Sequence, residues 1–326
     1  MSTSLLQRVA GAPITWGVSE VPVWGYQLDA GVVLSEMARI GLRATEVGPP
    51  GFLPTDPEAL RATLASHGLR AVGGFVPAVL HEPARLETEL ARVTAAADAL
   101  SAGGADVLVF AAAADDAYES TAELDDAAWG SLFEGIDRLN AIATDRRLIA
   151  ALHPHVGTVV ERGEHVERVL NESTTLLCLD TGHLRVGGTD PLALARTAPE
   201  RIAHVHLKDV DIQMARDLRV GSGYRDAVRS GLYRPLGEGD VDIQGIVRTL
   251  EGSGYRGWYV LEQDVVLDGA PGVREGPTRD AEASLRFLAG IANSSDDRLS
   301  FVGVDEEGGR RTVRPPREKR VRGGMG

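Results

Sequence analysis

The sequence predicts a closed (β/α)8 barrel, an α/β fold, on two observations. Eight short apolar runs rich in Val, Leu and Ala alternate with longer amphipathic stretches, which is the pattern of buried parallel strands connected by helices. The count of eight, within a body of barrel size at residues 1–292, favours a closed barrel. A doubly wound open sheet is the alternative, and the lack of a glycine-rich phosphate loop after the first run disfavours it.

Strands and helices are expected in alternation along the chain. The strands are predicted, in order, at 11–17, 42–48, 69–77, 105–112, 147–155, 174–183, 201–209 and 257–264. Helices are predicted near 30–40, at 56–68, 83–102 and 125–145, from about residue 242, and at 278–291. Asp56 is placed to cap the helix at 56–68, with Pro57 at its first position.

Two segments fall outside this alternation. The connection between Asp209 and the helix near 242 contains MARDLRVGSGYRDAVRSGLY at 214–233, and long insertions at the carboxyl end of a barrel strand usually cover the active site. We expect a lid or substrate loop there. From about Asn293 the apolar periodicity fades into the basic, Gly- and Pro-containing RRTVRPPREKRVRGGMG, so residues 293–326 are predicted to be a disordered tail. Binding of this tail to nucleic acid or a membrane is the alternative interpretation.

Composition narrows the class of protein. The net charge of −13 disfavours general binding to nucleic acid, since an acidic surface repels phosphate backbones. Cys178 is the only cysteine, which excludes an intrachain disulfide and fits a reducing compartment. We see no signal peptide and no apolar run of membrane-spanning length, so we expect a cytoplasmic protein with no membrane partner. The sequence leaves homo-oligomer formation open.

Ionisable side chains gather at the carboxyl ends of the predicted strands, where barrel enzymes place their chemistry. In chain order they are Glu46, His153, His155, Asp180, His183, His204, His206, Lys208, Asp209, Glu262 and Asp264. One histidine on a strand is usually a satisfied core residue, but five on three neighbouring strands would be poorly solvated without a partner. A divalent cation satisfies imidazole and carboxylate groups together, so the pattern predicts a metal site.

The predicted ligands come from successive strands. Asp180, His206 and Glu262 would supply three of them, and the preceding strand would supply a fourth through His153 or His155. Mixed nitrogen and oxygen ligands suit Mn, Co, Zn or Fe(II), and the sequence does not choose among them.

Several motifs resemble a known family. LDTGH, HVHLKD and LGEGDVDIQGIVRTLEGSGYRGWYVLEQD resemble the xylose isomerase-like TIM barrels, which include sugar isomerases and epimerases. GAPITWG, TEVG, HPHVGT and HVHLKDV are more similar to the inosose dehydratase branch, over about residues 10–290. Two segments depart from that branch: GVSEVPVWG stands where an Asn/Asp-rich stretch is expected, and EQD replaces a longer EAEQD ending.

The resemblance implies roles for individual residues. It implies that Asp180, His206 and Glu262 are metal ligands and that His153 occupies the slot of a ligand glutamate. It also implies that His183 contacts the substrate. Trp16, Glu46 and Asp209 complete the predicted substrate-binding group.

The predicted activity is dehydration of a keto-polyol such as 2-keto-myo-inositol through an enolate, by a metal-dependent lyase. Glu262 or Lys208 would be the base, and His155 or His183 the acid that protonates the leaving hydroxyl. With histidine in the place of one carboxylate, the symmetry of two-base epimerases is lost. A metal-dependent keto-sugar isomerase or 3-epimerase is the alternative, followed by a noncatalytic sugar-binding protein.

Overall fold

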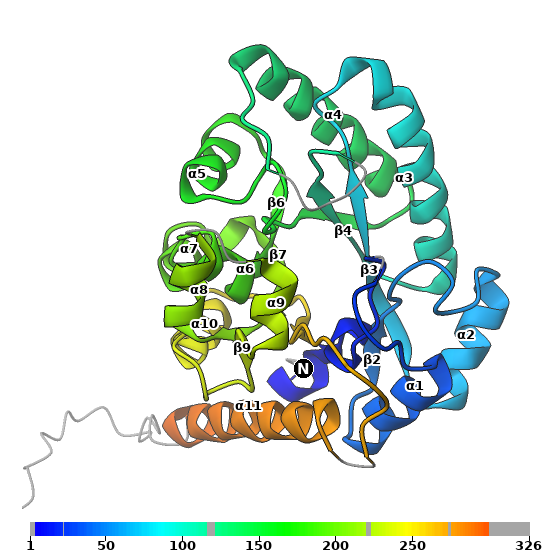
Figure 1. The fold of residues 1–326 in the computed structure, drawn as a ribbon, viewed down its shortest axis with the longest axis vertical. Coiled ribbons are helices and arrows are strands. Elements are labelled where there is room, and N and C mark those ends of the chain that lie inside the picture. The colour runs from blue at the N-terminus through cyan, green and yellow to red at the C-terminus, as the bar shows by residue number, and fades with distance from the viewer. Residues whose placement is uncertain (1–3, 22, 116–120, 220–222, 273–274, 300–326) are drawn as a thin grey trace, which may run out of the picture.

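Eight parallel strands close into a barrel with helices packed around the outside, as the sequence predicted (Figure 1). The computed structural model describes residues 4–21, 23–115, 121–219, 223–272 and 275–299. Around the barrel the strand order is β1-β10-β7-β6-β5-β4-β3-β2. These strands are β1 (Val9–Gly11), β2 (Ala44–Glu46), β3 (Arg70–Ala78), β4 (Val107–Ala112), β5 (Ile149–Leu152), β6 (Leu176–Asp180), β7 (Ile202–Leu207) and β10 (Tyr259–Leu261).

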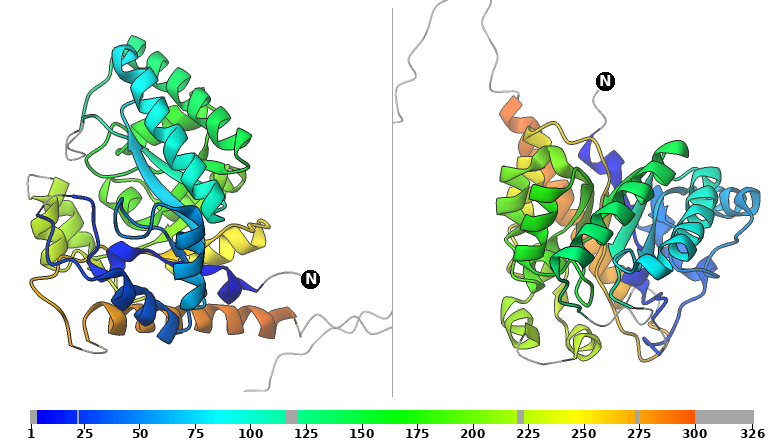
Figure 2. Two further views of the ribbon diagram at one scale, coloured as in Figure 1. Left: turned by 90° about the vertical axis from the view of Figure 1, so that its right-hand side faces the viewer. Right: turned by 90° about the horizontal axis from the view of Figure 1, so that it is seen from above.

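The helices surround this barrel, as the two views of Figure 2 show. They are α1 (Ala30–Arg39), α2 (Pro57–Ser66), α3 (Pro83–Gly103), α4 (Asp126–Asp145), α5 (Gly163–Glu172), α6 (Thr181–Val186), α7 (Pro191–Thr197), α8 (Ile212–Arg219), α9 (Tyr224–Arg229), α10 (Ile243–Gly252) and α11 (Pro277–Leu299). The predicted cap of α2 is confirmed, because the Asp56 carboxylate accepts the backbone N–H of Ala59 at 2.8 Å. Within the described residues, no helix is both long and apolar enough to cross a membrane.

The first strand differs from its prediction. Only Val9–Gly11 pair in the barrel, and Pro13–Trp16 of the predicted strand form the 3-10 helix η2. Pro13 has no N–H to donate to a strand ladder, and Gly17 ends the turn with a left-handed φ of 80°. The turn redirects the chain at the carboxyl end of β1 and carries Trp16 away from the barrel axis.

The sixth strand also ends earlier than predicted. β6 stops at Asp180, and residues 181–183 of the predicted strand begin helix α6. The Asp180 Oδ1 atom accepts the backbone N–H groups of Gly182 and His183 at 2.8 and 2.7 Å, which starts the helix. These two bonds fix one carboxylate oxygen, and Oδ2 faces other side chains.

The long connection after β7 has structure of its own. It contains the strand β8 (Asp209–Val210), the helices α8 and α9, and the strand β9 (Tyr233–Arg234), which pairs antiparallel with β8. At the other end of the chain, α11 continues to Leu299, past position 293 where the tail was expected to begin. Residues 300–326, the rest of the predicted tail, lie outside the described residues.

Candidate active site

A cavity of about 470 Å³ lies at the carboxyl ends of the barrel strands. Its polar lining includes residues from strands on opposite sides of the barrel, from helices α3 and α9, and from the β1–α1 connection, which supplies Glu20. These polar residues include Glu46, His153, His155, His206, Tyr224, Glu262 and Asp264. Apolar residues of the β1–α1 and β2–α2 connections, among them Ile14, Trp24 and Leu53, complete the wall. A small polar molecule therefore has a bounded space next to the predicted ligands.

His206 lies between carboxylates on both sides of its ring. Its Nε2 donates to Glu46 Oε1 at 3.0 Å, and its Nδ1 lies 2.7 Å from Glu262 Oε2 and 3.6 Å from Asp180 Oδ2. The strand register explains the meeting, because His206 pairs with Asp180 on one side and with Val260, two residues before Glu262, on the other. Glu46 orients the imidazole so that Nδ1 points at the other two carboxylates.

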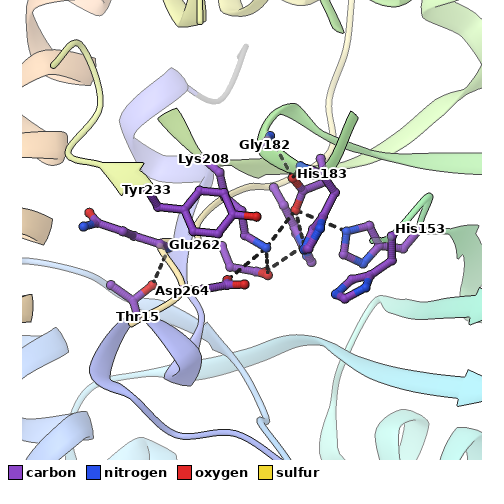
Figure 3. Close-up of polar contacts among 12 residues, drawn as sticks. Thr15, His153, Gly182, His183, Lys208, Tyr233, Glu262 and Asp264 are labelled. Carbon is purple, nitrogen blue, oxygen red and sulfur yellow. Dashed lines mark hydrogen bonds and ion pairs between the residues drawn. The ribbon is translucent and has the colours of Figure 1, made fainter. Parts of the chain in front are cut away.

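Lys208 is fully buried and makes ion pairs with three carboxylates (Figure 3). Its Nζ lies 2.7 Å from Glu262 Oε1, 3.0 Å from Asp264 Oδ1 and 3.1 Å from Asp180 Oδ2. Burial alone would lower the pKa of Lys208, but these carboxylates hold that pKa well above its ordinary value. Lys208 therefore carries its positive charge in this arrangement, and its role as one of the two candidate bases stays a prediction.

Glu262 is held in its negatively charged form, in contrast to the cationic Lys208. Burial would raise its pKa, but His206 and Lys208 outweigh burial and lower the pKa to about 2. Glu262 is thus a carboxylate at neutral pH, and it borders the cavity. Of the two predicted bases, Glu262 is the one that carries no proton in this arrangement.

The two histidines predicted as acids hold different tautomers, each fixed by the backbone. His155 Nδ1 donates to the carbonyl of Val156 at 2.6 Å, so Nε2 carries no proton when the ring is neutral. His183 Nδ1 accepts the N–H of Val156 at 3.3 Å, so its proton lies on Nε2, a buried atom with no hydrogen-bond partner among the described residues. Burial lowers the pKa of His155 to about 3, so this ring is not an imidazolium at neutral pH.

His153 follows the fifth strand, at the position where the family resemblance implies a ligand glutamate. It contacts the other proposed ligands through Asp180. Its Nε2 lies 3.2 Å from Asp180 Oδ2, and its ring stands edge-on to that of His206, with the centroids 4.9 Å apart. The side chain is buried, and Nδ1 has no hydrogen-bond partner within the part of the chain that the structure describes. Burial lowers the pKa of His153, which keeps the ring neutral and able to act as a ligand.

These residues fit a divalent cation. Asp180, His206 and Glu262 each offer a buried ligand atom, and the three atoms lie within 4.8 Å of one another. His153 groups in the same way with Asp180 and His183, so Asp180 joins the two sets. Mixed carboxylate and imidazole donors suit first-row divalent metals, and the Glu46 bond to His206 has the form of the outer carboxylate that orients a ligand histidine.

Two predicted substrate contacts lie elsewhere. Trp16 is fully buried, does not line the cavity, and donates its indole N–H to Glu36 and Thr278. Its prediction assumed a strand through residue 17, whereas the η2 turn directs the ring towards α1 and α11. Asp209 accepts the backbone N–H groups of residues 210, 237, 239 and 241, so its carboxylate holds the β8–β9 region together instead of facing a substrate.

Two residues near Lys208 were missing from the predicted set of site residues. Asp264 ends the β10 segment and was visible as a polar residue two positions after Glu262, on the same face. Tyr224 comes from α9, inside the segment expected to be a lid, and donates its hydroxyl to Asp264 Oδ2 at 2.6 Å. The position of Tyr224 in a segment without strand periodicity gave no indication of that contact.

The buried histidines predict a loss of stability in mild acid. The pKa values of six histidines are lowered in the folded protein, chiefly by burial: His81, His153, His155, His165, His183 and His204. Below about pH 6.5 these histidines bind protons in the unfolded chain, whereas in the folded chain the rings stay neutral. The free energy of unfolding therefore falls as pH falls. Each such proton contributes about 1.4 kcal/mol per pH unit. His206, whose pKa is raised, contributes with the opposite sign.

Urea unfolding of metal-free protein between pH 7.5 and pH 5 measures this effect. The free energy of unfolding is expected to decline with a slope of more than one proton, and His155→Gln should make the slope shallower. A free energy that stays constant across this range would contradict neutral burial of these rings.

With fold and site in place, the class of protein is defined: the chain belongs to the xylose isomerase-like TIM barrel family, whose model matches residues 34–290. Within that class it is related to inosose dehydratases, which confirms the resemblance seen in the motifs. The inosose dehydratase of Geobacillus kaustophilus (strain HTA426) is 32% identical over 272 residues, which cover 79% of this chain and 87% of the relative.

A second curated relative and a solved structure extend the comparison. The rhizopine catabolism protein MocC of Rhizobium meliloti is 32% identical over 307 residues, or 90% of this chain and 91% of that protein. A crystal structure of IOLI protein with a binding zinc atom has a TM-score of 0.66 at 13% identity and covers 88% of this chain and 98% of its own. At that identity the solved structure supports the fold alone.

Proposed function

We propose that this chain is a cytoplasmic, metal-dependent hydro-lyase that dehydrates a keto-polyol such as 2-keto-myo-inositol. The observation that carries the proposal is the position of Glu262, an ionised carboxylate that borders the cavity and belongs to a set of cation ligands. The 32% identity to an inosose dehydratase over most of the chain supports this substrate class.

In this proposal, four residues would hold a divalent metal ion. Asp180, His206 and Glu262, with His153 beside them, would hold one Mn, Co, Zn or Fe(II) ion. When bound, such an ion supplies Lewis-acid polarisation of the ketone oxygen, which makes the neighbouring C–H group more acidic. Glu46 keeps His206 oriented for this purpose through its hydrogen bond to Nε2.

The chain's own residues then move one proton. Glu262 accepts the proton from the carbon next to the ketone, which leaves an enolate. The electron pair of the enolate expels the hydroxyl group from the next carbon. The proton that Glu262 accepted passes to His155 Nε2, which carries none in the neutral ring, and from there to the departing hydroxyl, which leaves as water. Glu262 and His155 thereby return to their starting protonation states.

Product mass tests the reaction type. Metal-reconstituted protein is incubated with inososes and keto-sugars, the products are separated, and their masses are measured by mass spectrometry. Dehydration yields a product lighter than the substrate by one water molecule, with no turnover in protein that has been stripped of metal. Products of unchanged mass would refute the dehydratase proposal and establish the alternative, a keto-sugar isomerase or 3-epimerase. Binding without any product would identify a noncatalytic sugar-binding protein.

A further inference from the structure

Lys208 stands in competition with any cation that the site would bind. Its Nζ is paired with Glu262 Oε1 and Asp180 Oδ2, which are oxygens of two proposed ligands. Asp180 has no spare oxygen, since Oδ1 is occupied by the backbone N–H groups that begin α6. A divalent ion can therefore use these carboxylates fully only if the Lys208 ammonium has another partner.

Asp264 is that other partner. Its Oδ1 lies 3.0 Å from Lys208 Nζ, and Asp264 belongs to none of the groups of residues that could hold a metal ion within the described chain. The carboxylate is buried, so its orientation depends on protein contacts and not on solvent. The contact that orients it is the hydroxyl of Tyr224, 2.6 Å from the opposite oxygen, Oδ2.

Tyr224 is itself held in place from three sides. Its hydroxyl lies 3.0 Å from that of Tyr233, and its ring stacks on His183 with the centroids 5.9 Å apart. The ring of Trp24 lies 6.3 Å away, and the next residue, Arg225, donates to the Trp24 carbonyl at 2.7 Å. Helix α9 is thus tied to the β1–α1 connection, and this arrangement directs the Tyr224 hydroxyl at Asp264.

We propose that Tyr224 is a positioning residue for metal binding: it holds Asp264 as the partner of Lys208, which releases Asp180 and Glu262 to the cation. The inference rests on the metal site of the proposed function, but it concerns affinity for the ion and not the reaction. Loss of the Tyr224 hydroxyl would free Asp264 to turn away, and Lys208 would then pair more strongly with the ligand carboxylates.

Titration with Mn²⁺, followed by the electron paramagnetic resonance signal of the free ion, tests the proposal without substrate. Tyr224→Phe is expected to weaken Mn²⁺ binding by about three- to tenfold, an effect in the range of one typical intramolecular hydrogen bond. The matched control is Tyr255→Phe. It removes another part-buried tyrosine hydroxyl, which donates to the Trp258 carbonyl at 2.8 Å and contacts neither Asp264 nor Lys208, so binding should change less than twofold.

The Lys208→Met variant distinguishes a positioning role of Tyr224 from a general loss of structure. Lys208→Met removes the competing cation and should tighten Mn²⁺ binding, and Tyr224→Phe in that background should have no further effect. If Tyr224→Phe does not fold, Asp264→Asn is tested instead. Asp264→Asn should reduce Mn²⁺ affinity more in the native chain than in the Lys208→Met variant. The proposal is overturned if Tyr224→Phe binds Mn²⁺ like the native chain, or if its loss is equally large without Lys208. A native chain that binds no Mn²⁺ overturns the metal site itself, and product mass still decides the reaction independently.

Discussion

Replacement of Glu262 by glutamine is expected to lower kcat by roughly 10²- to 10⁴-fold, the usual cost of removing a general base. Glutamine keeps the shape of the side chain but cannot accept the proton next to the ketone. It also leaves Lys208 and His206 without the carboxylate that lies 2.7 Å from each. The loss should appear in kcat as well as in kcat/KM, because the proton is transferred only in the transition state.

Because Glu262 is also a proposed ligand, the assay needs saturating metal. Turnover is measured over a series of metal concentrations, and the plateau values of Glu262→Gln and the native chain are compared. A variant that recovers native turnover at high metal concentration would show that Glu262 only binds the ion, and the base would then be another residue.

Replacement of His206 by alanine is expected to abolish metal binding and with it turnover. His206 is the ligand that stands between Asp180 and Glu262, and its loss also leaves Glu46 without one of its two imidazole partners. Removing one member of a buried charged pair costs about 3–5 kcal/mol, so the metal-free variant should also unfold at lower denaturant concentration.

His204→Gln is the matched control for His206. His204 contacts the same oxygen of Glu46, at 2.9 Å, but lies outside the group formed by Asp180, His206 and Glu262. Its replacement should keep metal content near the native value, as measured by elemental analysis of protein purified without chelator. Full metal occupancy in His206→Ala would place the metal elsewhere. Loss of metal in His204→Gln would favour the second group, Glu46, His204 and His206.

The barrel and the centre of the site were predictable because both follow from local pattern and strand order. Buried parallel strands appear as short apolar runs, and each polar residue at a strand end points to the same end of the barrel. Asp180 and His206 are register partners on neighbouring strands, so a prediction that placed both at strand ends brought them together.

The remaining errors arise from contacts between segments far apart in sequence. Trp16 lies in the core because a turn begins at Pro13, and a run of apolar residues looks alike in a strand and in a short 3-10 helix. Asp209 was expected in the pocket, but its partners are backbone groups more than 25 residues away along the chain, at 237–241. The ion pairs of Lys208 with three carboxylates from other segments were not predicted, because no local pattern encodes them.

The dependence of dehydration on bound metal tests the central claim most directly. Protein stripped of metal is titrated with a divalent ion, and the rate of water loss from an inosose is recorded at each ratio of metal to chain. The account predicts no turnover without metal and a rise that levels off at one ion per chain, with Asp180→Ala inactive throughout. Turnover that persists at the native rate in fully stripped protein would contradict it.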